Sequence, residues 1–154
     1  MALDYAINHP IGLSGLILVG SAPSWPIETG FLEVWRKDPQ KALEKDNSAL
    51  FSKKTPKHII DRYNEQARAN PAEVWLADAE NYTSYDLDNE IEQITLPALA
   101  VCGDEEVWIN GTEMINSKLS NASKTVIPGA GHSIMVEQPD QLNEAINQFL
   151  RVIS

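Results

Sequence analysis

The chain has 154 residues, of which 43% are hydrophobic, so length and composition predict one globular unit with enough apolar side chains for a core. Its 22 acidic and 12 basic residues give a formal charge of -10, which argues against nucleic acids and anionic membranes as partners. Cys102 is the one cysteine, so no disulfide can form within the chain. No apolar run approaches the roughly 18 residues of a membrane span. We therefore expect a cytoplasmic protein that binds neither nucleic acid nor membrane.

The first residues predict a helix that is followed by a buried strand. Apolar residues at helical spacing indicate a helix over residues 2–8, which must end before Pro10. The apolar run over residues 13–20 then ends in glycine and predicts a strand. Ser14 lies where this strand begins, so we interpret it as structural.

The middle of the chain, residues 23–94, is predicted to be helical. Three dipeptides place a good N-cap residue before a proline at the first helical position: Asp38-Pro39, Thr55-Pro56 and Asn70-Pro71. They predict three helices after an earlier one, with the ranges 28–36, 39–51, 56–69 and 71–82. Five large apolar residues invite interpretation as pocket lining, but we expect them to pack within the protein: Phe31, Trp35, Trp75, Tyr82 and Met114.

A second strand is predicted over residues 96–103, because an apolar run without alternation is typical of a strand buried on both faces of a parallel sheet. Three consecutive carboxylates follow it at once, namely Asp104, Glu105 and Glu106. Cages for hard metal ions draw their ligands from several spaced positions, so this run does not predict a metal site. We expect neither a metal nor a cofactor.

The last part of the chain predicts a helix over 112–119, a short strand over 124–127 and an amphipathic helix over 141–154. Between the last two elements, a turn with two glycines presents His132. A lone loop histidine is usually solvated and inert. Here, however, the strand over 96–103 and the strand over 124–127 both run into glycine and then into ionisable residues. Open α/β sheets place their chemistry at the edge where such strands end.

Two motifs together resemble the C-terminal part of a cap-bearing α/β-hydrolase: Leu96-Pro-Ala-Leu-Ala-Val-Cys-Gly103 with its acidic cluster, and Ile127-Pro-Gly-Ala-Gly-His-Ser133 with Glu137-Gln138-Pro139. The resemblance implies a partial α/β fold with about three parallel strands. Residues 1–22 and 95–154 would form the core, and residues 23–94 a helical cap over the active site.

The same resemblance implies roles for the ionisable residues. His132 would be the base of a catalytic triad, and Glu106, three residues after Gly103, would be its acid. The family's usual residue at that position is Asp. Glu can also serve, and Asp104 and Glu105 remain alternative acids.

The nucleophile of such a triad does not occur in the sequence. Gly12-Leu-Ser-Gly-Leu16 fails the Gly-x-Ser-x-Gly pattern at its last position, and Ser133 directly follows the base. In the resembled family the nucleophile would lie upstream of Met1. The chain would then belong to a hydrolase of small, mostly apolar ester-like or related substrates, would supply only the histidine and the acid, and would be inactive alone. The alternatives are a non-catalytic binding module and one half of a split hydrolase that another chain completes.

The resemblance also bears on assembly. It places the strand over residues 15–19 in mid-sheet, with a neighbour that this sequence does not contain. An unpaired strand edge can pair with another chain. We therefore expect a homo-oligomer, or pairing of this strand with another chain.

Overall fold

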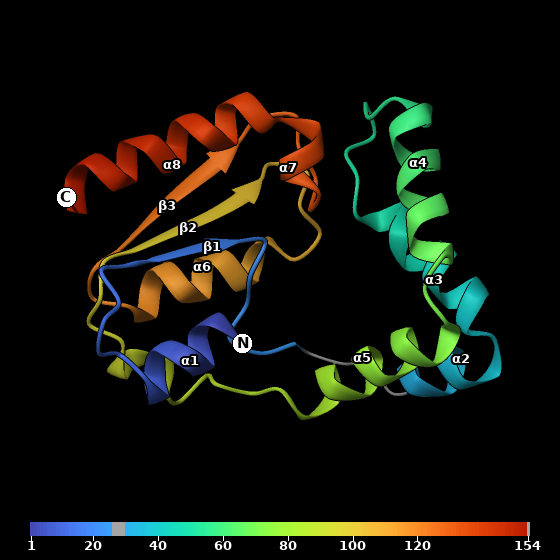
Figure 1. Cartoon of the computed structure of the whole chain (residues 1–154), viewed down its shortest axis with the longest axis horizontal. Helices are drawn as coiled ribbons and strands as arrows, with labels where there is room; N and C mark the ends of the chain where they lie inside the picture. The colour runs from blue at the N-terminus through green and yellow to red at the C-terminus, as the bar shows by residue number, and fades with distance from the viewer. Residues whose placement is uncertain (26–29, 154) are drawn as a thin grey trace.

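The computed structural model describes residues 1–25 and 30–153 and is an α/β structure with one parallel sheet (Figure 1). Its elements in chain order are α1 (Ala2–Asn8), β1 (Leu16–Val19), α2 (Phe31–Lys37), α3 (Pro39–Ala49), α4 (Lys57–Arg68), α5 (Ala72–Ser84), the short 3₁₀ helix η1 (Ile91–Gln93), β2 (Ala98–Gly103), α6 (Ile109–Lys118), β3 (Ala122–Ile127), α7 (Ile134–Glu137) and α8 (Pro139–Ile153). The predicted start of α2 at residues 28–29 lies outside the described residues.

The sheet has the strand order β1-β2-β3, and both neighbouring pairs are parallel. Leu16 lies opposite Ala98 in the first pair, and Gly103 lies opposite Ile127 in the second. All six residues of the central strand β2 are buried, because helices cover both faces of the sheet. The predicted fold class, with three parallel strands and flanking helices, is therefore confirmed.

Helices lie on both faces of the sheet (Figure 1), and each face carries its own apolar cluster. Successive residues of a strand point to opposite faces, so Ala98 and Ala100 pack on the side of α1, η1 and α6. Leu99 and Val101 pack on the side of α7 and α8. A buried β2 thus anchors both layers and fixes where its carboxyl end lies.

Helix α8 lies along one face of the sheet and begins at Pro139, earlier than the predicted residue 141. Proline is well tolerated in a first helical turn, where its missing N–H would have no partner. Leu150 is 43% exposed, although its spacing places it with the apolar residues of this helix. It lies about 80° around the helix from Leu142, at the margin of the apolar stripe. The short helix α7 was not predicted.

Helices α2 to α5 follow β1 in the described part of the chain and pack around an apolar cluster of their own. Trp35, Leu43 and Ala79 are buried in it, and Phe31 and Trp75 pack against it. In Figure 1 this helical insert, residues 30–84, lies beyond the carboxyl ends of the strands. The sequence predicted these four helices, and the packing of Phe31, Trp35 and Trp75 within the insert is confirmed.

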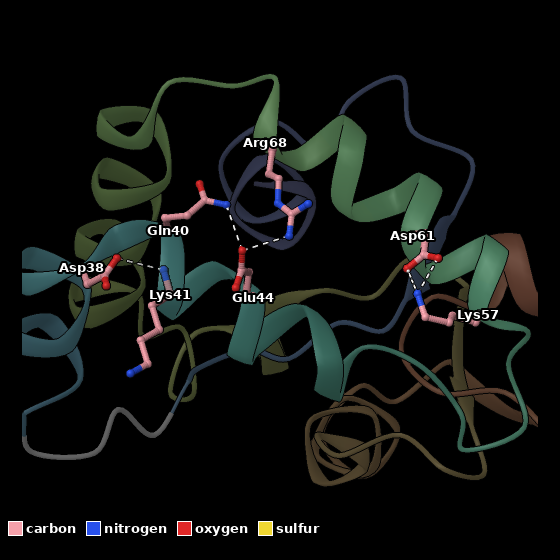
Figure 2. Close-up of polar contacts among 7 residues, drawn as sticks. All are labelled: Asp38, Gln40, Lys41, Glu44, Lys57, Asp61 and Arg68. Atoms are coloured by element: carbon pink, nitrogen blue, oxygen red, sulfur yellow. Dashed lines mark hydrogen bonds and ion pairs between the residues drawn. The ribbon is translucent and has the colours of Figure 1, made fainter.

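One of the three predicted caps forms, and two predictions are wrong. The Asp38 carboxylate accepts a hydrogen bond from the Lys41 backbone N–H at 3.1 Å (Figure 2). Pro56 and Pro71 have ψ of 136° and 143°, which is extended backbone, so α4 and α5 begin after the prolines and not at them. Neither helix has a side-chain cap. Thr55 instead donates its hydroxyl to Glu137.

Charged side chains on the insert form a few exposed contacts (Figure 2). Lys57 pairs with Asp61 at 2.7 Å, and Arg68 pairs with Glu44 at 2.9 Å. A hydrogen bond from Gln40, and then one from Arg68, lower the pKa of Glu44. Solvent screens pairs of this kind, so they contribute little to stability, and the insert depends on its apolar cluster instead.

Across the described residues, no helix is long and apolar enough to cross a membrane.

Candidate active site

His132 lies in the turn between β3 and α7, at the carboxyl edge of the sheet. Gly129 adopts a φ of +72° in this turn, a conformation that favours glycine. Its backbone N–H donates to the Asp104 carboxylate at 2.7 Å. Asp104 therefore ties the histidine turn to the loop that follows β2.

The imidazole of His132 contacts a buried carboxylate. Its Nδ1 lies 2.9 Å from Oε2 of Glu106, and the Glu106 side chain is only 1% exposed. The other carboxylate oxygen, Oε1, accepts a hydrogen bond from the Trp108 backbone N–H at 3.2 Å. A carboxylate in its ionised form only accepts hydrogen bonds, so beside such a carboxylate a neutral ring would carry its proton on Nδ1 and leave Nε2 as the basic nitrogen.

The three consecutive carboxylates point to three different partners. Asp104 bonds the Gly129 backbone, Glu105 accepts from the Lys53 backbone N–H at 3.0 Å, and Glu106 contacts His132. The sequence left Asp104 and Glu105 as alternatives to Glu106, and the geometry brings Glu106 alone of the three to the ring. In the part of the chain that the structure describes, no three His, Cys, Asp or Glu side chains could together hold a metal ion.

The glycines that end β1 and β2 give the dyad of His132 and Glu106 its space. A Cβ on Gly20 would lie 2.8 Å from Cε1 and Nδ1 of His132. A Cβ on Gly103 would lie 2.0 Å from the carbonyl oxygen of Ala130. Both distances are shorter than side chains allow, so the close approach of the histidine turn to both strand ends requires glycine there.

A row of aromatic rings leads from the helical insert to His132. Trp108 packs edge to face against the imidazole with centroids 5.1 Å apart, and Trp25 packs in the same way against Trp108 at 5.4 Å. Tyr82 of α5 follows at 6.0 Å from Trp25. Sequence reasoning missed Trp25 and Trp108. The position of Trp108, two residues after Glu106, was the available signal.

A cavity of about 500 Å³ is bounded by α1, the end of β1 and α5, and neither His132 nor Glu106 is among its lining residues. Its volume falls in the range of small-molecule sites. Asp78 adds a carboxylate to its wall. Apolar and aromatic side chains form most of the rest, namely Leu3, Leu18, Trp25, Tyr82 and Tyr85. Gly20 belongs to this wall and also abuts His132. Tyr82, which we expected to pack within the protein, packs against Trp25 and also lines this cavity. Met114, in contrast, is half-buried on α6.

The candidate nucleophiles of this chain are poorly placed. Ser14 precedes β1, at the opposite end of the sheet from His132. Ser133 is 4% exposed, and the Ser21 hydroxyl donates to the Val19 carbonyl at 3.2 Å. Burial raises the pKa of the Cys102 thiol, which disfavours the reactive thiolate.

The sheet, the site at its carboxyl edge and the likeness to solved structures make this an α/β-hydrolase fold. A thermophilic esterase matches with a TM-score of 0.82 and 26% identity, over 99% of this chain and 62% of that one. An esterase from Exiguobacterium antarcticum matches in fold with a TM-score of 0.85 and 19% identity, over 97% and 62%. The sequence matches the Ndr family over residues 1–153, and the chain belongs to that family.

Curated relatives extend the same likeness. A proline iminopeptidase from Pestalotiopsis fici is 27% identical over 177 residues, and a pimeloyl-[acyl-carrier protein] methyl ester esterase from Yersinia enterocolitica is 23% identical over 166. Each alignment covers 97% of this chain, which spans 63% and 64% of the two relatives. The homologues are thus hydrolases of the α/β-hydrolase fold.

Proposed function

We propose that the chain supplies the base and the acid of a nucleophile–His–acid triad in a hydrolase. The observation that carries this proposal is the 2.9 Å contact between His132 Nδ1 and the buried carboxylate of Glu106. Nε2 of His132 takes the proton of the nucleophile as the nucleophile bonds to the substrate carbonyl carbon, and then gives that proton to the leaving group. In the second half of the reaction Nε2 takes a proton from water as the water oxygen bonds to the acyl carbon. It then returns this proton to the nucleophile as the bond between the nucleophile and the acyl carbon breaks. Glu106 orients the ring and stabilises the imidazolium.

In this proposal the nucleophile comes from outside the 154 residues. The sequence contains no Gly-x-Ser-x-Gly motif, and the chain spans less than two thirds of the relatives it matches. We use "the completed enzyme" for this chain together with a segment that carries the nucleophile, in the same polypeptide or in another one. Residues 1–22 and 95–154 act as core, and residues 23–94 act as the cap.

The proposed substrate is a small, mostly apolar ester or a related acyl compound. The support is the cavity of about 500 Å³ with its apolar and aromatic wall, which meets the dyad at Gly20. The names of the relatives, among them a methyl ester esterase and a thermophilic esterase, point to the same chemistry. Tyr82 in the cavity wall gives the insert a direct part in substrate selection.

The test begins with the coding sequence upstream of the Met1 codon. An in-frame Gly-x-Ser-x-Gly motif there, followed by expression of the longer chain, should give an esterase whose serine reacts with a fluorophosphonate probe. Replacing His132 by alanine in that longer chain should abolish the labelling. A longer chain that carries the motif, folds and still neither hydrolyses short acyl esters nor reacts with the probe would overturn the proposal.

A second candidate, a binding module, is favoured by the position of β1. Among the described residues this strand pairs with β2 alone, so no described strand pairs with the backbone groups of its other edge. Leu16 and Gly20 donate their N–H groups to the β2 side, and because this direction alternates along a strand, the N–H of Ile17 points to the open edge. We propose that this edge pairs with a second copy of the chain, or with the other half of a split hydrolase.

The isolated chain is accordingly expected to sediment as a dimer or larger oligomer, or to be poorly soluble. Ile17→Pro removes one outward N–H while sparing the bonds to β2, so it should shift the chain toward monomer. Ile17→Val keeps the N–H and the apolar side chain and should leave the assembly unchanged. A wild-type chain that sediments as a monomer at high concentration would contradict the pairing.

A further inference from the structure

The linker between α3 and α4, residues 50–56, lies against the histidine turn, although far from it in sequence. The Ser133 backbone N–H donates to the Leu50 carbonyl at 2.9 Å. The Lys53 backbone N–H donates to the Glu105 carboxylate at 3.0 Å. The linker is therefore bonded to the residue that follows His132 and to the residue that precedes Glu106.

Glu137, the last residue of α7, joins the linker to the turn more directly. Its Oε2 accepts a hydrogen bond from the Gly131 backbone N–H at 2.8 Å. Its Oε1 accepts one from the Ser52 backbone N–H at 2.7 Å and another from the Thr55 hydroxyl. One half-buried carboxylate thus accepts bonds from the residue before His132 and from two residues of the linker.

The linker and the turn touch without side chains between them. A Cβ on Gly131 would lie 2.7 Å from the Phe51 carbonyl carbon and 2.8 Å from the Ser52 nitrogen. Phe51 is 7% exposed and packs edge to face against Tyr63 of α4, with ring centroids 5.3 Å apart. A displacement of α4 would therefore move the linker, and the linker cannot move without the turn.

We propose that Glu137 is a positioning residue that couples the helical insert to His132. The inference rests on the proposed function only in taking His132 as the base. The carboxylate holds the turn and the linker in one arrangement, and that arrangement sets the imidazole against Glu106. A ligand that shifts the insert would consequently change the orientation of His132, so that occupancy of the cavity and readiness of the base are linked.

Glu137→Gln changes the chemistry of this contact with almost no change in shape. An amide keeps one acceptor oxygen, and its NH₂ group would face an N–H donor from either Gly131 or Ser52. Hydrogen bonds to a charged acceptor are the stronger ones, so the loss falls on the contact between linker and turn. Glu144→Gln is the matched control, because Glu144 is exposed on α8 and its carboxylate accepts a hydrogen bond from Gln148, one turn further along the same helix.

The experiment is nuclear magnetic resonance on the full 154-residue chain and needs no catalysis. Amide hydrogen exchange at Gly131, Ser52 and Ser133 should be about tenfold faster in Glu137→Gln, with α8 amides unchanged. The His132 ring should lose the single Nδ1–H tautomer that its contact with Glu106 selects. Glu144→Gln should leave both signals as they are in the wild type.

Thr55→Val is a second variant that removes one donor and leaves the carboxylate in place. It should speed exchange at Ser52 and shift the His132 ring signals in the same direction as Glu137→Gln, by less. Faster exchange in the linker with an unchanged His132 ring in both variants would overturn the coupling. A uniform rise over the whole chain in both variants would overturn it too, because Glu137 would then be stabilising the fold in general. Failure of the proposed hydrolase function leaves these signals untouched, so the two tests are independent.

Discussion

Glu106→Gln is expected to lower kcat/KM of the completed enzyme by about 10⁴-fold, by analogy with the change of a triad aspartate to its amide. The Gln side chain fills the same buried space, but its NH₂ group can face Nδ1 of His132 and hold the ring as the opposite tautomer. Nε2 would then carry the proton and could not act as the base. Steady-state hydrolysis of a short-chain aryl ester measures the loss, and circular dichroism checks that the fold is retained.

The control for this change is Asp104→Asn. Asp104 is exposed and bonds the Gly129 backbone N–H, and Glu106 is the carboxylate that contacts the ring. An amide oxygen can still accept that bond, so activity should fall by less than about tenfold. If Asp104→Asn proved the more damaging of the two changes, the role of the acid would pass to Asp104.

The 154-residue chain alone is expected to show no labelling by a fluorophosphonate probe and an esterase rate near that of free imidazole. General-base catalysis contributes about 10² to 10⁴-fold, but only when the base faces a group whose proton it can take. Among the described residues, the His132 ring is hydrogen-bonded to Glu106 and to no serine, threonine or cysteine side chain. Its dyad can therefore activate only water.

Gel fluorescence with the probe, and ester hydrolysis with His132→Ala as the background, measure this expectation. A longer chain or a two-chain complex that does label supplies the positive control. Stoichiometric labelling of the 154-residue chain that disappears in His132→Ala would show that the nucleophile lies within the sequence after all.

The sequence by itself determined the layers of the fold. The unbroken apolar run that ends at Gly103 can be accommodated only in a strand covered on both faces, and β2 is buried throughout. The apolar stripe of α8 likewise predicts its buried face, because periodicity is a local property of the chain. Even the meeting of Glu106 and His132 at one edge follows from the two parallel strands β2 and β3, since their carboxyl ends lie side by side.

Tertiary structure decided everything that depends on contacts between distant segments. Asp104, Glu105 and Glu106 follow β2 in direct succession, and the paths of the histidine turn and of residues 50–56 give each a different partner. The sequence predicts Thr55 as a helix cap, but in the structure its hydroxyl donates a hydrogen bond to Glu137 of α7. Such hydrogen bonds depend on distance in space and not on separation in sequence, so the local pattern could not predict that Glu137 accepts bonds from both Gly131 and Ser52.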